Sequence, residues 1–130
     1  MITKNKILIG IATYNECKNI EKLIEEISKI NKIDFDILIV DDNSPDKTAL
    51  QVKALQKNNS NLLLIQRNGK FGLGSAHKRI FHFAKIHKYD ALITMDADFS
   101  HPPSLIKEFI RQHDRDTLRR ASPYELFPRT

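Results

Sequence analysis

Residues 92–103 read Leu92-Ile93-Thr94-Met95-Asp96-Ala97-Asp98-Phe99-Ser100-His101-Pro102-Pro103. The apolar start predicts a buried strand, and the serine and prolines at the far end predict the beginning of a helix. Side chains at positions i and i+2 of a strand point the same way, so Asp96 and Asp98 can present both carboxylates beyond one sheet edge. Two such charges about 5 Å apart, at an effective dielectric constant near 20, repel by roughly 3 kcal/mol.

A divalent cation is the simplest group that offsets this repulsion. Mg²⁺ is typically bound by one or two carboxylates together with the phosphates of a substrate. Asp96 and Asp98 are therefore the candidate metal ligands and the candidate catalytic pair. A turn whose acidic residues cap the next helix would give the same pattern, so the pair by itself does not decide between the two readings.

Composition restricts the class of protein. The chain has 130 residues, of which 41% are hydrophobic, which is enough for one domain with a real core. Its net charge of +5 comes mainly from scattered lysines, without the arginine–aromatic alternation of a nucleic-acid surface, so no nucleic-acid partner is expected. A mild attraction to anionic membrane surfaces or phosphorylated ligands is expected instead.

The single cysteine, Cys17, excludes an internal disulfide framework and suits a reducing compartment. No apolar run approaches the roughly 20 residues of a membrane span, and no apolar signal region follows the N-terminus. We therefore expect a soluble cytoplasmic protein, with at most a peripheral association with a membrane surface.

Apolar runs and helical patterns alternate along the chain. A continuous apolar run of the kind found in strands buried on both faces occupies residues 7–12, and mostly apolar stretches at 35–40, 62–65 and 92–95 predict three further buried strands. Amphipathic spacing predicts helices between them, the second of which should begin with Ser44 as N-cap and Pro45 as first helical residue. A short helix bearing Ile106 and Phe109 should follow the last strand. This order predicts an α/β fold, a Rossmann-like doubly wound and mostly parallel sheet with right-handed crossovers.

Ligands bind to such sheets beyond the carboxyl ends of the strands, where the strand order switches. With the order 3-2-1-4, the segment 14–16 and the pair Asp96 and Asp98 flank the switch point, and Asp41 and Asp42 lie one strand away. The residues alone therefore predict an acidic, metal-dependent site for a phosphorylated ligand.

Four motifs in sequence order resemble the N-terminal half of the family 2 glycosyltransferases, in particular the dolichol-phosphate and polyprenol-phosphate mannose synthases. They are Ala12-Thr13-Tyr14-Asn15-Glu16, Ile39-Val40-Asp41-Asp42-Asn43-Ser44-Pro45-Asp46, Lys70-Phe71-Gly72-Leu73-Gly74-Ser75-Ala76 and Met95-Asp96-Ala97-Asp98-Phe99-Ser100-His101-Pro102-Pro103. The resemblance covers roughly residues 5–113. It implies a truncated GT-A type fold, with a nucleotide-sugar-binding domain at 1–113 and a divergent or irregular tail at 114–130.

The resemblance also implies an activity, namely inverting transfer of a sugar to a polyprenyl or dolichyl phosphate, with GDP-mannose as the favoured donor. Asp96 and Asp98 would hold Mg²⁺ or Mn²⁺ on the donor diphosphate and carry the catalysis. The implied nucleotide-sugar-binding residues are Thr13, Tyr14, Glu16, Asp41, Asp42, Lys70 and Asp96.

The tail contains no counterpart of the acceptor-side segment of the family, which leaves alternatives open. The chain could be an inactive remnant that binds a nucleoside diphosphate, or it could be completed by a homodimer partner or by another subunit. A second alternative is a receiver-like signalling domain, with Asp41 and Asp42 as its Mg²⁺-binding pair and Asp96 as the phosphoryl acceptor.

Overall fold

The computed structural model describes residues 6–30, 35–98, 104 and 106. Within these residues strands and helices alternate as follows: β1 (Ile7–Thr13), α1 (Ile20–Ser28), β2 (Phe35–Asp41), α2 (Thr48–Leu55), β3 (Leu62–Gln66), α3 (Leu73–Ile86) and β4 (Ala91–Asp96). The strands form one sheet in the order β3-β2-β1-β4, and every neighbouring pair is parallel. The predicted parallel α/β sheet is confirmed, and its order is the 3-2-1-4 arrangement on which the expected position of the site depends.

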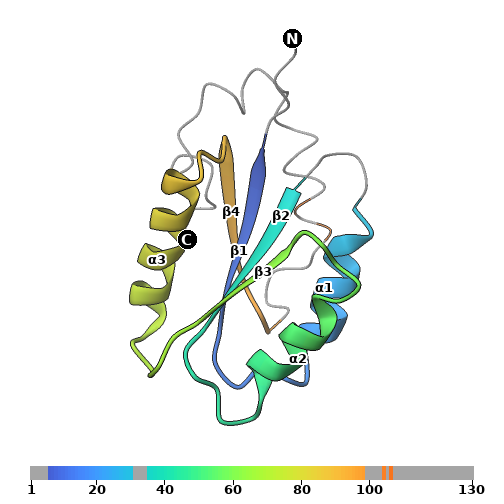
Figure 1. The fold of residues 1–130 in the computed structure, drawn as a ribbon, viewed down its shortest axis with the longest axis vertical. Coiled ribbons are helices and arrows are strands. Elements are labelled where there is room, and N and C mark those ends of the chain that lie inside the picture. The colour runs from blue at the N-terminus through green and yellow to red at the C-terminus, as the bar shows by residue number, and fades with distance from the viewer. Residues whose placement is uncertain (1–5, 31–34, 99–103, 105, 107–130) are drawn as a thin grey trace.

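The sheet is covered on both faces, by α1 and α2 on one side and by α3 on the other (Figure 1). Successive residues of β1 serve the two layers in turn: Ile7 and Ile9 pack in the cluster that contains α1, whereas Leu8 packs with α3. Because both faces of β1 and β2 are buried over most of their length, the two strands are mainly apolar and do not alternate with polar residues.

Gly10 lets α3 approach β1 closely. A Cβ atom added at Gly10 would lie 2.5 Å from Cγ2 of Ile80, and Ile80 is fully buried, so its side chain has little room to move. We predict that Gly10→Ala lowers the free energy of unfolding by about 1–3 kcal/mol, the usual cost of overpacking a core.

Urea denaturation of the two proteins measures this effect, and Gly74→Ala is its control. Nothing lies within 4 Å of a Cβ built on Gly74, which is the second residue of α3. Alanine there removes a glycine from the first turn of the helix, so stability should hold or rise by up to about 1 kcal/mol. Equal effects at the two positions would contradict the close-packing argument.

The start of α2 differs from the prediction. The helix begins at Thr48 and not at Pro45, because Ser44 gives both its amide and its hydroxyl to Asp41. Asp46 takes over at the helix start, where its carboxylate accepts the Thr48 N–H at 3.1 Å. Ser44 thus bonds to Asp41 at the end of β2 and does not cap the helix as its local sequence pattern predicts.

The C-terminal predictions fall mostly outside the described residues. Ser104 and Ile106 are helical, and Ile106 is buried, whereas Phe109, the boundary at residue 113 and the tail 114–130 are not described. Among the helices that are described, none is both long and apolar enough to cross a membrane.

Candidate functional site

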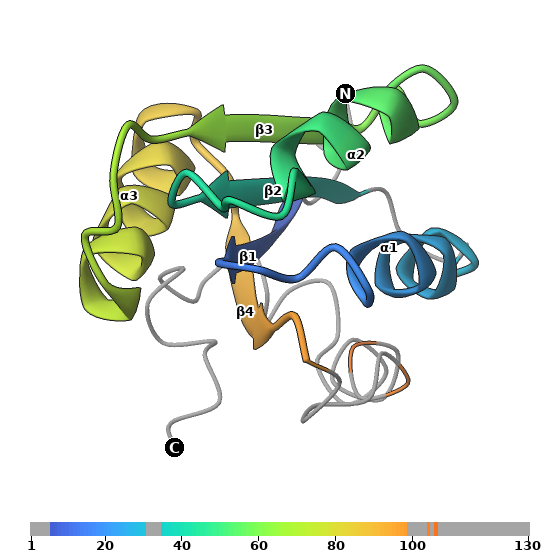
Figure 2. The ribbon, with the colours of Figure 1, turned by 90° about the horizontal axis from the view of Figure 1, so that it is seen from below.

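The loops that leave the strands all emerge at one edge of the sheet, at the bottom of Figure 1, and Figure 2 views the molecule from this side. At this edge, between β1 and β4, lies a pocket of about 360 Å³. The connection from β1 crosses one face through α1, and the connection into β4 crosses the other face through α3, so the pocket occupies the switch point of the sheet. Its lining residues are Ala12, Thr13, Tyr14, Glu16, Asp42, Lys70, Gly72, Leu73, Ala76, Asp96, Ala97 and Asp98.

Of the eight residues predicted for the site, all except Asp41 line this pocket. They come from segments far apart in the sequence, which the parallel sheet brings to one edge. Tyr14, Lys70 and Asp98 are exposed, Glu16 and Asp96 are half-buried, and Thr13 and Asp42 are buried.

Asp96, at the end of β4, and Asp98, just beyond it, both line the pocket. In the part of the chain that the structure describes, no group of three or more histidine, cysteine, aspartate or glutamate side chains is placed to hold a metal ion. Two carboxylates would leave most coordination positions of a divalent cation to water or phosphate oxygens. That donor set fits Mg²⁺ or Mn²⁺ carried by a phosphorylated ligand, as opposed to a closed protein cage.

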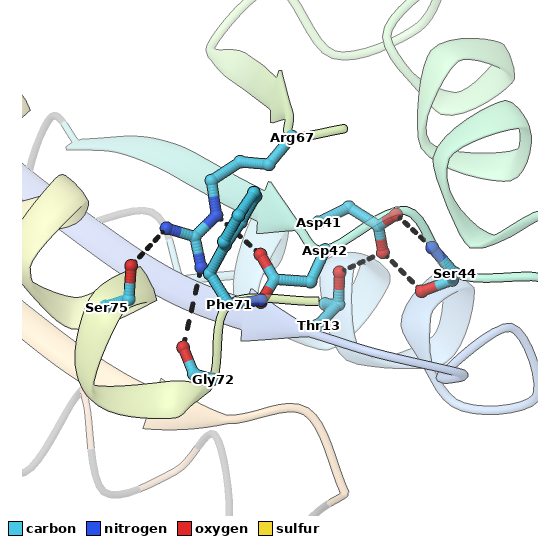
Figure 3. Close-up of polar contacts among 8 residues, drawn as sticks. All are labelled: Thr13, Asp41, Asp42, Ser44, Arg67, Phe71, Gly72 and Ser75. Atoms are coloured by element: carbon cyan, nitrogen blue, oxygen red, sulfur yellow. Dashed lines mark hydrogen bonds and ion pairs between the residues drawn. The ribbon is translucent and has the colours of Figure 1, made fainter. Parts of the chain in front are cut away.

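Asp41 is wholly buried and supports the pocket wall from behind. Its carboxylate accepts hydrogen bonds from the Thr13 hydroxyl at 2.6 Å, the Ser44 amide at 2.9 Å and the Ser44 hydroxyl at 2.6 Å. Its backbone carbonyl accepts the Arg67 N–H at 2.8 Å. The side chain thus joins the ends of β1 and β2 (Figure 3).

Asp42, the next residue, faces the pocket and is bound on both oxygens. Arg67 Nε lies 2.5 Å from Oδ1, and the Phe71 amide donates to Oδ2 at 3.0 Å. Burial acts to raise the pKa of Asp42, but the hydrogen bond from Arg67, the Phe71 amide and the charge of Arg67 outweigh it, so the pKa lies below its usual value. The stabilisation from this ionised carboxylate is present above its unfolded-state pKa and is lost as the pH falls through the folded-state pKa.

The loop after β1 is held by the loop after β2. Three consecutive backbone amides donate to side chains of that second loop and of the first residue of α2: Asn15 to Ser44 Oγ at 2.9 Å, Cys17 to Asp46 Oδ2 at 3.1 Å and Glu16 to Thr48 Oγ1 at 3.1 Å. These bonds satisfy backbone donors of the loop that precedes α1. They orient the segment that carries the two pocket residues Tyr14 and Glu16.

Lys70 and Tyr14 meet across the pocket. The Lys70 ammonium lies 4.3 Å from the centroid of the Tyr14 ring, within the range of a cation–π attraction. The contact joins the loop before α3 to the loop after β1, two segments that are far apart in the sequence.

Cys17 lies beside this cluster, and its environment disfavours the thiolate form. A hydrogen bond with Asp46 raises the pKa of Cys17, and burial and the negative charge of Asp46 add to the effect. Because the thiolate is the reactive form, we predict slow alkylation by iodoacetamide at pH 7.5 and a severalfold faster rate in Asp46→Ala. Asp36→Ala, a substitution in β2 far from Cys17 in the fold, should leave the rate unchanged, and equal acceleration in both variants would contradict the assignment.

The sequence profile of glycosyl transferase family 2 matches residues 8–119. The chain belongs to glycosyltransferase family 2. This confirms the family resemblance of the four motifs. Family membership leaves the receiver-domain interpretation without support. That interpretation needs Asp41 and Asp42 to bind Mg²⁺, but both carboxylates are already engaged in the hydrogen bonds described above.

Curated relatives within this glycosyltransferase family are similar over most of the chain. It is 36% identical over 106 residues to a dolichol-phosphate mannosyltransferase of Pyrococcus furiosus, which covers 81% of this chain and 29% of the relative. It is 33% identical over 107 residues to an undecaprenyl-phosphate mannosyltransferase of Micrococcus luteus, which covers 81% of this chain and 43% of the relative. The chain thus spans less than half the length of each of these two relatives.

Solved structures show the same fold. The mannosyltransferase PcManGT from Pyrobaculum calidifontis, in complex with GDP-Man and Mn²⁺, superposes with a TM-score of 0.66 at 21% identity, covering 74% of this chain and 28% of that one. TarS 1-349 of S. aureus in complex with UDP-GlcNAc gives 0.64 at 24% identity, covering 83% and 32%. The prediction of a GT-A type fold is confirmed.

Sequence reasoning missed Arg67 and the hydrogen-bonding residues Asp46 and Thr48. The polar run after β2 is the sequence signal for the last two, and its local pattern predicts only a helix cap at Ser44. For Arg67, nothing in the sequence distinguishes the residue that pairs with Asp42 from the other cations of the chain.

Proposed function

We propose that this chain is the donor-binding half of an inverting glycosyltransferase that transfers mannose from GDP-mannose to a polyprenyl or dolichyl phosphate. The observation that carries the proposal is the convergence of seven predicted residues from three strand ends and one loop on a single pocket at the switch point. Support comes from the family 2 membership and from the names of the two curated relatives.

In this proposal the pocket has a nucleotide side and a diphosphate side. Thr13, Tyr14, Glu16 and Asp42 line the nucleotide side, and Asp41 acts by bracing Thr13, since its own carboxylate is wholly buried.

On the diphosphate side, Lys70 approaches the negative charge of the donor, and Asp96 and Asp98 are the ligands for Mg²⁺ or Mn²⁺. A cation bound there supplies electrostatic stabilisation to the leaving nucleoside diphosphate as its charge develops. The two aspartates contribute by placing that charge beside the donor phosphates.

The reaction forms a bond between an acceptor phosphate oxygen and the anomeric carbon of the sugar. The bond from that carbon to the donor diphosphate breaks, and GDP leaves with the electron pair. Attack from the face opposite the leaving group inverts the anomeric centre. A phosphate monoester is already ionised near neutral pH, so no residue needs to act as a general base.

The acceptor side is proposed to involve residues beyond this pocket, supplied by further chain, by a second copy or by another subunit. A lipid phosphate acceptor would place the protein at a membrane surface as a peripheral, cytoplasmic-face enzyme.

Calorimetric titration of the purified chain with GDP and with UDP, each with and without Mn²⁺, tests the donor site. We expect GDP binding that requires the metal, and weaker binding of UDP. A folded chain that binds neither nucleotide would overturn the proposal. Metal-dependent binding without transfer of labelled mannose to polyprenyl phosphate would favour the inactive remnant instead.

A further inference from the structure

The guanidinium of Arg67 contacts three residues, two of which, Asp42 and Gly72, line the pocket (Figure 3). Its Nε donates to Asp42 Oδ1 at 2.5 Å, its Nη1 to Ser75 Oγ at 2.7 Å and its Nη2 to the Gly72 carbonyl at 3.4 Å. Asp42 follows β2, Gly72 is the N-cap of α3, and Ser75 lies in the first turn of α3. One side chain therefore connects the end of β2 to the start of α3.

The segment between Arg67 and Phe71 closes around the Asp42 carboxylate. Arg67 binds one carboxylate oxygen and the Phe71 amide binds the other, and the Arg67 guanidinium lies 5.2 Å from the centroid of the Phe71 ring. Lys70 lies inside this closed segment and reaches across to Tyr14. The position of Lys70 in the pocket therefore depends on the two ends of the segment being held.

Arg67 itself is not part of the pocket lining. The side chain of Arg67 is 13% exposed and that of Asp42 is 7% exposed, so the ion pair is largely shielded from water. The N–H donors of Arg67 described above bond to protein atoms. Its partners Asp42 and Gly72 do line the pocket, as does Lys70. A buried ion pair adds little net stability compared with apolar packing. The Arg67 guanidinium, however, carries five N–H donors in one rigid plane, so it is well suited to fixing the relative positions of its acceptors.

We propose that Arg67 is a positioning residue of the donor pocket. By holding Asp42, Gly72 and Ser75 in one arrangement, it orders the segment 68–72 and the first turn of α3, and so sets the affinity of the pocket for a nucleoside diphosphate. That the ligand is a nucleoside diphosphate rests on the proposed function. That Arg67 orders the segment 68–72 rests only on contacts within this chain.

Two substitutions separate the effect of the positive charge of Arg67 from the effect of its planar set of N–H donors. Arg67→Lys keeps a cation that can pair with Asp42, but a single ammonium does not reach Asp42, Gly72 and Ser75 together. Arg67→Met removes both the charge and the planar set of donors while keeping much of the packing volume. If the planar set of donors orders the segment, Arg67→Lys also loses this order, and Arg67→Met loses more of it.

Amide hydrogen exchange over residues 68–75 and calorimetric titration with GDP and Mn²⁺ provide the two measurements. We expect faster exchange in both variants, with GDP affinity about 10- to 100-fold weaker in Arg67→Met, by analogy with the loss of residues that orient metal ligands, and an intermediate affinity in Arg67→Lys. Tyr89→Phe is the matched control. It deletes the hydroxyl that donates to Asp36 at 2.5 Å, at the opposite end of the sheet, and should leave both readouts unchanged.

Unchanged exchange over residues 68–75 in both variants overturns the positioning role. Faster exchange with unchanged GDP affinity overturns its link to binding. If the wild-type chain binds no nucleotide, the proposed function fails, and the exchange measurement still decides whether Arg67 orders the segment. Should Arg67→Met not fold, Arg67→Lys and Ser75→Ala, which both keep a cation beside Asp42, carry the same two measurements with the same outcomes.

Discussion

The double substitution Asp96→Asn/Asp98→Asn should weaken Mn²⁺-dependent GDP binding by at least about 100-fold. Both side chains keep their size, but the pocket loses the two negative charges that would attract a divalent cation, and neutral amide oxygens are much poorer ligands for it. Under the proposed function, Lys70 would then be the main positive charge left in the pocket to face the donor diphosphate. Calorimetry measures the loss directly, and circular dichroism checks that the variant is folded.

The control for this result is Glu21→Gln/Glu25→Gln. It removes the same amount of negative charge from exposed positions of α1, so it reproduces the change in net charge away from the pocket. Its GDP affinity should match that of the wild type. If the aspartate variant kept its Mn²⁺-dependent affinity, the metal assignment would be wrong, and the Asp-x-Asp pattern would be a turn that caps the following helix.

Asp41→Ala should lower the free energy of unfolding by about 3 kcal/mol. The substitution leaves the Thr13 hydroxyl and the amide and hydroxyl of Ser44 without their acceptor, and an unsatisfied buried donor costs about 1–3 kcal/mol. Asp41→Asn keeps one acceptor oxygen, so its loss should be about half as large. Urea denaturation measures both values.

Glu21→Ala, an exposed position in α1, is the reference for this series and should change stability by less than about 0.5 kcal/mol. The same experiment separates two roles for Asp41. A bracing residue loses stability when replaced, whereas a direct ligand contact loses GDP affinity at unchanged stability. The second result would show that Asp41 opens to the ligand and contacts it directly, as the family resemblance implied.

Much of this architecture can be predicted from the sequence alone. A strand buried on both faces is apolar on both, so the runs 7–12 and 37–40 within β1 and β2 stand out, and parallel strands need crossover helices whose handedness leaves few possible orders. The location of the pocket followed, because ligand-binding loops gather where the order switches.

Predictions from local sequence patterns were wrong where a side chain could bond to more than one partner. Ser44 and Pro45 have the form of a helix start, but Ser44 binds Asp41 and the helix begins at Thr48. Similarly, Asp41 and Asp42 are adjacent and chemically identical, yet Asp41 supports the wall from inside and Asp42 faces the pocket. Alternation along an extended chain separates the two side chains, but which one meets the ligand depends on what packs on each face.

The sequence by itself thus determined the parallel sheet, the edge at which the pocket lies and the acidic character of that edge, because these depend on hydrophobic periodicity and on residues close together in the chain. Only the tertiary structure decided which of the two adjacent carboxylates faces the pocket, which cation pairs with Asp42 and how the Lys70 segment is held. Those outcomes depend on contacts across 25 or more residues, such as that between Arg67 and Asp42. A side chain's choice among distant partners is set by the packing of the whole fold rather than by its neighbours in sequence.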